Sequence, residues 1–175
     1  MRRFVCGCAA IGLLLLGAAV AQGQNAHFGL GGGLIVPTGD YNTVDKTGWH
    51  VLGKVDIGIP MSPIGVRIDG MYGQTSHRSP LTGNTKLAGG TADAVWHIPT
   101  MVPGFKPYLL AGVGMFNWNP GGGSETKFTW GGGIGTSIGV GPMHGFAEGR
   151  YMSIQASGGS LKFLPVTVGL SFGAK

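Results

Sequence analysis

The chain has 175 residues and a formal net charge of +5; 11% of its residues are charged, 43% are hydrophobic and 36 are glycine. Ordinary globular proteins carry charge on about a quarter of their residues, so this composition is unusual for a protein whose whole surface meets water. The patterned apolar content excludes disorder, the lack of a Gly-X-Y period excludes collagen, and the scattered basic residues argue against a nucleic-acid partner.

The first residues predict a secretory signal peptide over 1–21. Two arginines precede the apolar stretch FVCGCAAIGLLLLGAAVA, which ends in the small-residue pattern of a cleavage site after Ala21. A retained membrane helix is the alternative, although the apolar run is short for a span. Both cysteines, Cys6 and Cys8, lie in this segment, so the expected mature domain, 22–175, has no disulfide and no thiolate site.

Beyond the signal peptide the sequence predicts strands and no helix. Segments of alternating character are separated by clusters of Gly, Pro, Asn and Ser, and apolar residues at helical spacing never persist without a glycine between them. Eight strands are expected, at 27–36, 49–59, 64–74, 86–98, 106–117, 126–139, 144–155 and 162–173.

The connections between these strands alternate in length. The first set is long and polar, except for its last and shortest member, and comprises 37–48, 74–85, 118–126 and 156–160. The second set is shorter, holds Pro or Gly, and comprises 60–63, 99–106 and 141–144. Long loops at one end and tight turns at the other are typical of an up-and-down barrel in an outer membrane, where the long loops lie outside and the turns are periplasmic.

Alternation within the strands separates two faces of the predicted sheet. One face collects β-branched and aromatic residues; those expected to face lipid or to form an interfacial girdle are Tyr72, Trp96, Trp130, Tyr151 and Phe172. The other face holds small residues and seven charges, three positive and four negative: Lys54, Asp56, Arg67, Asp69, Asp93, Glu148 and Arg150.

Two interpretations of these faces compete. In a soluble barrel or sandwich the apolar face points inward and the charges meet water. In a membrane barrel lipid contacts the apolar face and the lumen holds the polar one. The membrane barrel is favoured because the charges are few and nearly balanced and because aromatics gather toward strand ends. Small residues at most other sites of the polar face also suit a narrow eight-stranded lumen.

Five stretches carry a resemblance to a known family: GGGLIVPTGDY, KPYLLAGVGMF, FTWGGGIGTSI, GFAEGRY and VTVGLSF. They are similar to the small eight-stranded barrels of the OmpA/OmpX class, the group called outer membrane protein beta-barrel domain, over essentially the whole mature chain. The resemblance implies insertion by the outer-membrane assembly machinery, contact with outer-membrane lipid and, in many members, no enzymatic role. Members of this family usually end on the aromatic residue of the last strand, whereas here three further residues follow Phe172. Recognition by the assembly machinery is therefore less strongly implied than insertion as a barrel.

The seven charges of the polar face are the most specific feature. A lone charge is costly in a low-dielectric lumen, so these groups are expected to form a hydrogen-bonded network. One interpretation of the network is a structural plug that fills the barrel. The other is a gate, in which Glu148 and Arg150, supplied by one strand, exchange partners among the other charges and open a narrow pore.

A metal or catalytic site has little support, so no metal ligand, cofactor-binding residue or catalytic residue is predicted. An alternative is a lipid-modifying enzyme that uses Ser76, His77 and Ser79 of the stretch TSHRS in an outer loop. No zinc-type spacing and no partner cysteine accompany the five histidines, His27, His50, His77, His97 and His144.

The sequence thus predicts an all-β, eight-stranded, antiparallel up-and-down transmembrane barrel in the outer membrane of a Gram-negative bacterium. A structural or surface-interaction role is expected, without enzymatic activity and without a cofactor. The alternatives are a narrow small-solute pore, a lipid-modifying enzyme, and a soluble barrel that binds an apolar ligand. A monomer is expected, and the sequence identifies no extracellular partner.

Overall fold

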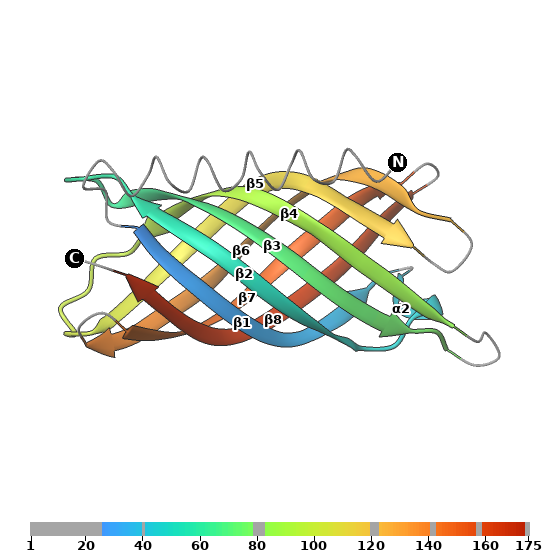
Figure 1. Ribbon diagram of the computed structural model, residues 1–175, viewed down its shortest axis with the longest axis horizontal. Helices are drawn as coiled ribbons and strands as arrows, with labels where there is room; N and C mark the ends of the chain where they lie inside the picture. The colour runs from blue at the N-terminus through green and yellow to red at the C-terminus, as the bar shows by residue number, and fades with distance from the viewer. Residues whose placement is uncertain are drawn as a thin grey trace.

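Eight antiparallel strands close into a barrel in the computed structural model, which describes residues 26–39, 41–78, 83–119, 123–140, 143–156 and 159–173. The predicted signal peptide lies outside the described residues. Figure 1 shows the strands inclined to the long axis of the barrel, with a short helix at one end.

Each strand expected from the sequence corresponds to one strand of the barrel. The helix, α2 (Tyr41–Val44), follows the first strand. The strands are β1 (Ala26–Thr38), β2 (Gly48–Gly58), β3 (Ile64–Ser76), β4 (Asn84–His97), β5 (Phe105–Asn119), β6 (Glu125–Val140), β7 (Met143–Ala156) and β8 (Gly159–Gly173).

Strands that follow one another in the sequence are neighbours in the barrel, and β8 pairs back with β1 to close it. Along this seam Phe28 lies opposite Phe172 and Leu30 lies opposite Leu170, so the outward-facing residues of the two strands stay in register. Closure removes free strand edges, and eight strands enclose an interior that side chains can fill. The predicted up-and-down topology is confirmed.

The connections differ from the prediction. Because β3 continues to Ser76 and β4 begins at Asn84, the connection 77–83 is no longer than 98–104 at the other end of the barrel. The predicted sorting into long and short connections is therefore weak. In addition, α2 is a single helical turn where no helix was predicted, since four residues are too few to show a helical period.

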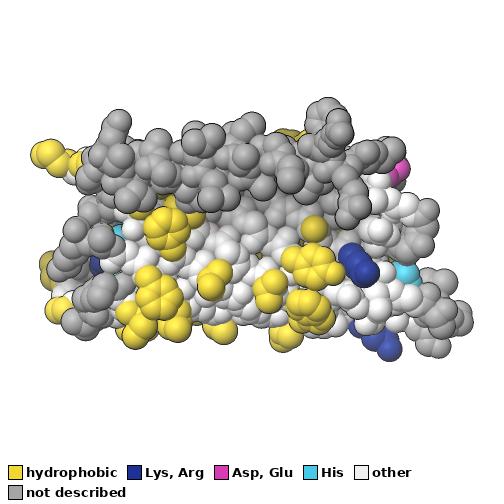
Figure 2. Space-filling model, in the orientation of Figure 1, with side chains coloured by type: hydrophobic (Ala, Val, Ile, Leu, Met, Phe, Trp, Pro, Cys, Tyr) yellow, Lys and Arg dark blue, Asp and Glu magenta, His cyan; other side chains and the backbone are white. Residues whose placement is uncertain are grey.

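The outer wall of the barrel is apolar. Among its aliphatic side chains, Ile68 is 51% exposed and Leu30 is 71% exposed. Trp49 and Tyr72 lie with ring centroids 5.9 Å apart near the α2 end, and Trp130 and Tyr151 lie 6.0 Å apart. The aromatic residues exposed near the other end are Phe28, Trp96, Phe105 and Phe172. Figure 2 shows large hydrophobic side chains in groups along this wall, as a membrane barrel with two aromatic girdles requires.

The inner wall carries the polar face of the strands. Arg67, Asp93 and Arg150 are each 2% exposed, whereas Val66 on the next outward position is 43% exposed. A soluble barrel with an apolar cavity would need the apolar face of its strands to point inward and the charged face to point outward. That alternative is wrong, because the charges point inward and the β-branched residues outward.

Two inward-facing glycines make room for large rings on the neighbouring strand. A Cβ built on Gly89 would lie 2.6 Å from Cγ of Phe116, the residue opposite it in β5. A Cβ on Gly135 would lie 2.6 Å from the hydroxyl oxygen of Tyr108, also directly opposite. Glycine at these positions lets an aromatic ring lie flat across the strand and fill the narrow interior.

Candidate functional site in the barrel interior

The two ends of the barrel provide a frame for the interior. The α2 rim is the end that holds α2 and the connections 39–47, 77–83, 120–124 and 157–158. The turn rim is the end that holds 59–63, 98–104 and 141–142. Between the rims the interior contains an apolar cluster next to the α2 rim, then a layer of charges, then a cavity that opens at the turn rim.

The first group of charges surrounds Arg67 of β3. Its guanidinium donates from Nε to Asp56 and from Nη1 to Oε2 of Glu148 at 2.7 Å. Lys54 Nζ lies 3.2 Å from the other oxygen of Asp56 and 3.9 Å from the ring centre of Phe146. We call Lys54, Asp56, Arg67 and Glu148 the Arg67 cluster; Tyr108 completes it by donating its hydroxyl to Glu148 at 2.8 Å.

The second group of charges surrounds Arg150 of β7. Nη1 of Arg150 donates to Asp69 at 2.6 Å, and Nη2 donates to Asp93 at 2.9 Å. The hydroxyl of Thr91 lies between the two carboxylates, 3.0 Å from Asp69 and 2.7 Å from Asp93. In this Arg150 cluster a single guanidinium therefore hydrogen-bonds two carboxylates from neighbouring strands, β3 and β4.

Glu148 and Arg150 are neighbours on the inward face of β7 but belong to different clusters. The structure thus brings all seven sequence-predicted charges into one layer and divides them into two hydrogen-bonded groups. Two buried atoms of this layer, Oε1 of Glu148 and Nε of Arg150, have no hydrogen-bond partner among the described residues. A buried ion pair contributes little net stability, yet deleting one partner costs several kcal/mol because the other charge stays buried.

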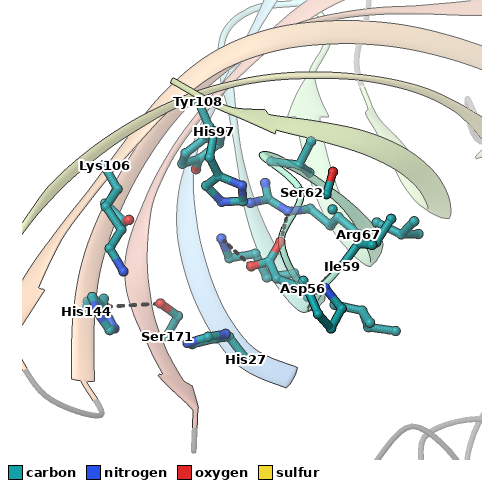
Figure 3. A pocket seen from close by; sticks show the side chains of 18 of the residues that line it. His27, Asp56, Ile59, Ser62, Arg67, His97, Lys106, Tyr108, His144 and Ser171 are labelled. Atoms are coloured by element: carbon teal, nitrogen blue, oxygen red, sulfur yellow. Dashed lines mark hydrogen bonds and ion pairs between the residues drawn. The ribbon is translucent and has the colours of Figure 1, made fainter. Parts of the chain in front are cut away.

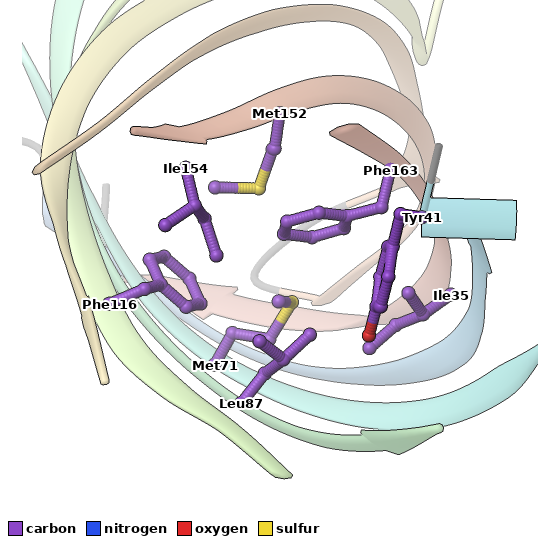
Figure 4. Packing of buried hydrophobic residues seen from close by; sticks show 8 residues of the cluster. All are labelled: Ile35, Tyr41, Met71, Leu87, Phe116, Met152, Ile154 and Phe163. Atoms are coloured by element: carbon purple, nitrogen blue, oxygen red, sulfur yellow. The ribbon is translucent and has the colours of Figure 1, made fainter. Parts of the chain in front are cut away.

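Large apolar side chains fill the interior between the charges and the α2 rim (Figure 4). Phe116, Ile154 and Phe163 are fully buried there, and the rings of Phe116 and Phe163 meet edge to face with centroids 6.4 Å apart. The remaining members of this apolar plug are Ile35, Tyr41, Met71, Leu87 and Met152.

The expectation that small residues fill most of the lumen is wrong for this half of the barrel. Phe116 and Met152 lie on the inward faces of β5 and β7, Met152 two positions after Arg150. Extending the inward alternation to the strand ends would have found these residues. A prediction that assigns every apolar strand residue to the lipid-facing wall misses both of them.

The helix α2 closes the α2 rim over the apolar plug. The Tyr41 hydroxyl and the Thr75 hydroxyl share a hydrogen bond of 2.8 Å, and Thr75 donates to the buried carboxylate of Asp45. Burial raises the pKa of Tyr41 well above its usual range, so this hydroxyl stays protonated. The closure is therefore held by side-chain hydrogen bonds that anchor the helical turn to β3.

The stretch TSHRS does not form a catalytic arrangement in its described part. His77 turns inward, and its Nε2 faces both the Thr85 hydroxyl at 3.1 Å and Asp45 at 3.5 Å. A relay would need the two ring nitrogens to serve the carboxylate and the hydroxyl separately, because one nitrogen cannot donate and accept at once. Ser76 is exposed at the end of β3, and Ser79 lies outside the described residues.

A cavity of about 440 Å³ opens at the turn rim (Figure 3). The Arg67 cluster forms its inner wall, with Lys54, Asp56 and Arg67 lining it. Nearer the mouth it is lined by three of the five histidines and by other polar side chains, namely His27, His97, Lys106, Ser137, His144 and Ser171. None of these mouth residues was predicted to contribute to a site.

The part of the chain that the structure describes holds no group of three His, Cys, Asp or Glu side chains placed to bind a metal ion. Within the same residues, no helix is long and apolar enough to cross a membrane. The residues predicted for the outer wall are where the alternation places them: Tyr72, Trp96, Trp130 and Phe172 are between 41% and 49% exposed, and Tyr151 is half-buried beside Trp130.

Comparison with known proteins identifies the architecture. Residues 7–173 match the family model described as outer membrane protein beta-barrel domain. Comparison with curated protein sequences gives no match.

Three solved structures illustrate the likeness of the fold. Neisserial surface protein A is 17% identical, with a TM-score of 0.65 and coverage of 86% of this chain and 97% of that one. OprG from Pseudomonas aeruginosa is 12% identical, with a TM-score of 0.52 and coverage of 86% and 97%. Ail, the attachment invasion locus protein of Yersinia pestis, solved with the heparin analogue sucrose octasulfate, is 17% identical, with a TM-score of 0.51 and coverage of 85% and 99%.

Proposed function

We propose, from the premise that the chain belongs to the outer membrane protein beta-barrel domain family, that it is a closed barrel with a surface-interaction role. In this proposal the α2 rim faces the cell exterior and binds anionic polymers or surfaces. The observation that carries the proposal is a set of exposed basic side chains at or next to this rim, Lys46, Arg78, Lys86 and Lys162.

Few acidic groups offset these charges among the described residues of the rim. Glu125 is exposed, but it pairs with Lys127 at 3.0 Å, and Asp45 is fully buried beneath α2. The rim therefore presents an excess of positive charge. Such a patch attracts polyanions over a distance of about 10 Å at moderate ionic strength.

The two connections that carry Lys46 and Arg78 are fixed to each other. The Lys46 amide donates to the Ser76 carbonyl at 2.8 Å, and the Arg78 amide donates to the Val44 carbonyl at 2.7 Å. The Arg78 guanidinium also donates to both the carbonyl and the side-chain oxygen of Asn42. A rim that is ordered before binding loses less conformational entropy when a partner arrives, which favours affinity.

The proposal includes further features that the sequence predicts. The barrel is exported through its signal peptide, is inserted by the outer-membrane assembly machinery, contacts outer-membrane lipid with its apolar wall and acts as a monomer. It has no enzymatic activity, and its role takes the form of adhesion or of support for the envelope. The likeness to Ail extends to the fold, so the preference for polyanions is argued from the basic side chains of this rim alone.

Retention on immobilised heparin, a sulfated polysaccharide probe, tests the proposal. The folded protein in detergent should bind at low salt and elute as salt rises, because each released counterion steepens the salt dependence. The double variant Lys46→Gln with Lys86→Gln should elute at lower salt. Lys106→Gln, at the turn rim, is the matched control and should elute with the wild type; no retention, or an equal effect of the control, would contradict the proposal.

A narrow pore is a second candidate, favoured by the unpartnered Oε1 of Glu148 and Nε of Arg150. These atoms offer the two clusters a way to exchange partners within the charged layer. A pore predicts that small sugars enter vesicles that contain the protein, at a rate that Arg150→Ala changes. The closed barrel predicts no uptake in either protein, because the apolar plug still blocks the lumen.

A further inference from the structure

We propose that the cavity at the turn rim is a binding site for a small solute that carries an oxyanion, either a phosphate or a carboxylate group. This inference is independent of the polyanion role of the α2 rim, since the two sites lie at opposite ends of the barrel. It rests on buried cationic side chains with spare hydrogen-bond donors, on further polar donors at the mouth, and on the shape of the cavity.

The inner wall of the cavity supplies two buried cations whose donors are only partly used. Arg67 is 2% exposed and lines the cavity, and its hydrogen bonds within the described residues use Nε and Nη1 but not Nη2. The side chain of Lys54 is 3% exposed, and its ammonium contacts one carboxylate, that of Asp56. An ammonium has three N–H groups and a guanidinium has five, so both residues can donate to a further acceptor.

The mouth of the cavity adds donors that face these cations. Figure 3 shows Lys106, His144, Ser171 and His27 along one side of the hollow, opposite His97 and Arg67. The rings of His27 and His144 meet edge to face with centroids 5.9 Å apart. An imidazole ring presents at least one N–H group to an acceptor.

The charges that line the cavity favour an anion over a cation. Asp56 is the one carboxylate among the lining residues, and its two oxygens already contact Arg67 and Lys54. Lys106 is exposed at the mouth and takes part in none of the ion pairs formed among the described residues. An entering anion would therefore meet the ammonium group of Lys106 at the mouth and, at the inner wall, the spare donors of Lys54 and Arg67, whose charges are balanced by Asp56 and Glu148.

The shape of the cavity indicates a bound solute and not a permeating one. Its volume of about 440 Å³ falls within the range of small-molecule sites and exceeds what a bare phosphate fills, so part of the solute would lie against the buried side chains of Val95 and Tyr108. Beyond Arg67 the lumen is filled by the charged layer and the apolar plug. The solute would therefore enter and leave through the turn rim.

The test is a titration of the folded protein with inorganic phosphate and, separately, with citrate, at ionic strength held constant with sodium chloride. The side-chain resonances of the five histidines are followed by NMR in detergent micelles. We expect those of His27, His97 and His144 to shift and saturate, while that of His77, at the α2 rim, stays in place. Saturation by phosphate alone would assign the site to phosphate compounds, and saturation by both anions would assign it to oxyanions in general.

Two variants decide whether the site is specific. Lys106→Gln should weaken binding by about tenfold, the effect of losing one charge-assisted hydrogen bond. Lys127→Gln, a lysine near the other rim that pairs with Glu125, should bind with wild-type affinity; both variants are first checked for folding by the shift in gel mobility on boiling. The proposal is overturned if no resonance saturates with either anion, if all five histidines shift alike, or if both variants weaken binding equally.

Discussion

The two halves of the barrel interior are filled by different chemistry on the same set of strands. Next to the α2 rim, β3, β5 and β7 contribute Met71, Phe116 and Ile154, which pack in one buried apolar cluster. Toward the turn rim the same strands contribute Arg67, Tyr108 and Glu148, which are joined by hydrogen bonds, and Arg67 and Tyr108 border a cavity. The first half seals the lumen, and the second half leaves room for a ligand.

The difference shows how a narrow barrel separates closure from binding. Apolar side chains fill space without needing partners, so they close the lumen at no cost in desolvated polar groups. Charged side chains need each other, and satisfying them along the wall leaves gaps at the centre that an anion can enter. The following variants test this comparison, from the largest expected effect to the smallest.

Arg150→Ala should have the largest effect, because Asp69 and Asp93 would both lose the cation they share. We expect the free energy of unfolding to fall by about 3–5 kcal/mol. Urea unfolding in detergent or lipid vesicles, followed by tryptophan fluorescence, measures it. Arg150→Lys keeps the charge but loses the planar pair of donors, and should fall between the alanine variant and the wild type. An alanine variant as stable as the wild type would show that the two carboxylates do not depend on Arg150.

Leu87→Ala should open a cavity in the apolar plug. Leu87 is 1% exposed, and truncation of such a leucine costs about 2–5 kcal/mol in unfolding free energy, depending on how far the neighbours collapse. The same unfolding measurement applies. Leu30→Ala on the outer wall is the matched control, and its smaller effect would mark the plug as a packed core; equal effects would argue against that.

Tyr41→Phe should loosen the closure at the α2 rim without opening the plug. The variant removes the hydrogen bond to Thr75 but keeps the ring, so the expected loss is about 1 kcal/mol. Hydrogen exchange of the α2 amides should quicken more than exchange of the β5 amides. Unchanged exchange in α2 would show that this hydroxyl does not hold the closure.

Glu125→Gln should have the smallest effect. The pair that Glu125 forms with Lys127 lies at the exposed rim, with the Glu125 side chain 60% exposed, so its loss should change stability by less than about 0.5 kcal/mol. High salt should abolish even that difference. A loss comparable to that of Arg150→Ala would remove the distinction between buried and exposed ion pairs on which the comparison depends.

Much of this architecture could be predicted from the sequence, because a strand has a period of two and a barrel has two walls. The alternation of Val66, Arg67 and Ile68 suffices to place one charge inside between two outward aliphatic residues. Alternation does not show which face points inward, because a soluble barrel produces the same pattern. The inward position of the charged face had to be argued from the small number of charges.

The contacts inside the lumen could not be predicted, because they join strands that are not consecutive in the sequence. The register brings Arg67 of β3 to Glu148 of β7 across the lumen, and no spacing in the sequence shows that contact. Likewise, His27 and His144 meet only because β8 lies between β1 and β7. The apolar plug was missed for another reason: Phe116 and Met152 look like lipid-facing residues until the parity of their own strands is followed to the end.

The most direct test of the asymmetry between the two halves uses two positions on the inward face of β6. Thr129 is fully buried opposite Ile154, whereas Ser137 lines the cavity at the turn rim. Cysteine is introduced at each position in turn, with Cys6 and Cys8 absent, and the folded protein reacts with a charged, water-soluble thiol reagent. We predict rapid labelling of Ser137→Cys and no labelling of Thr129→Cys before unfolding. Comparable labelling of both would show that water reaches the α2 half and that the lumen is not sealed there.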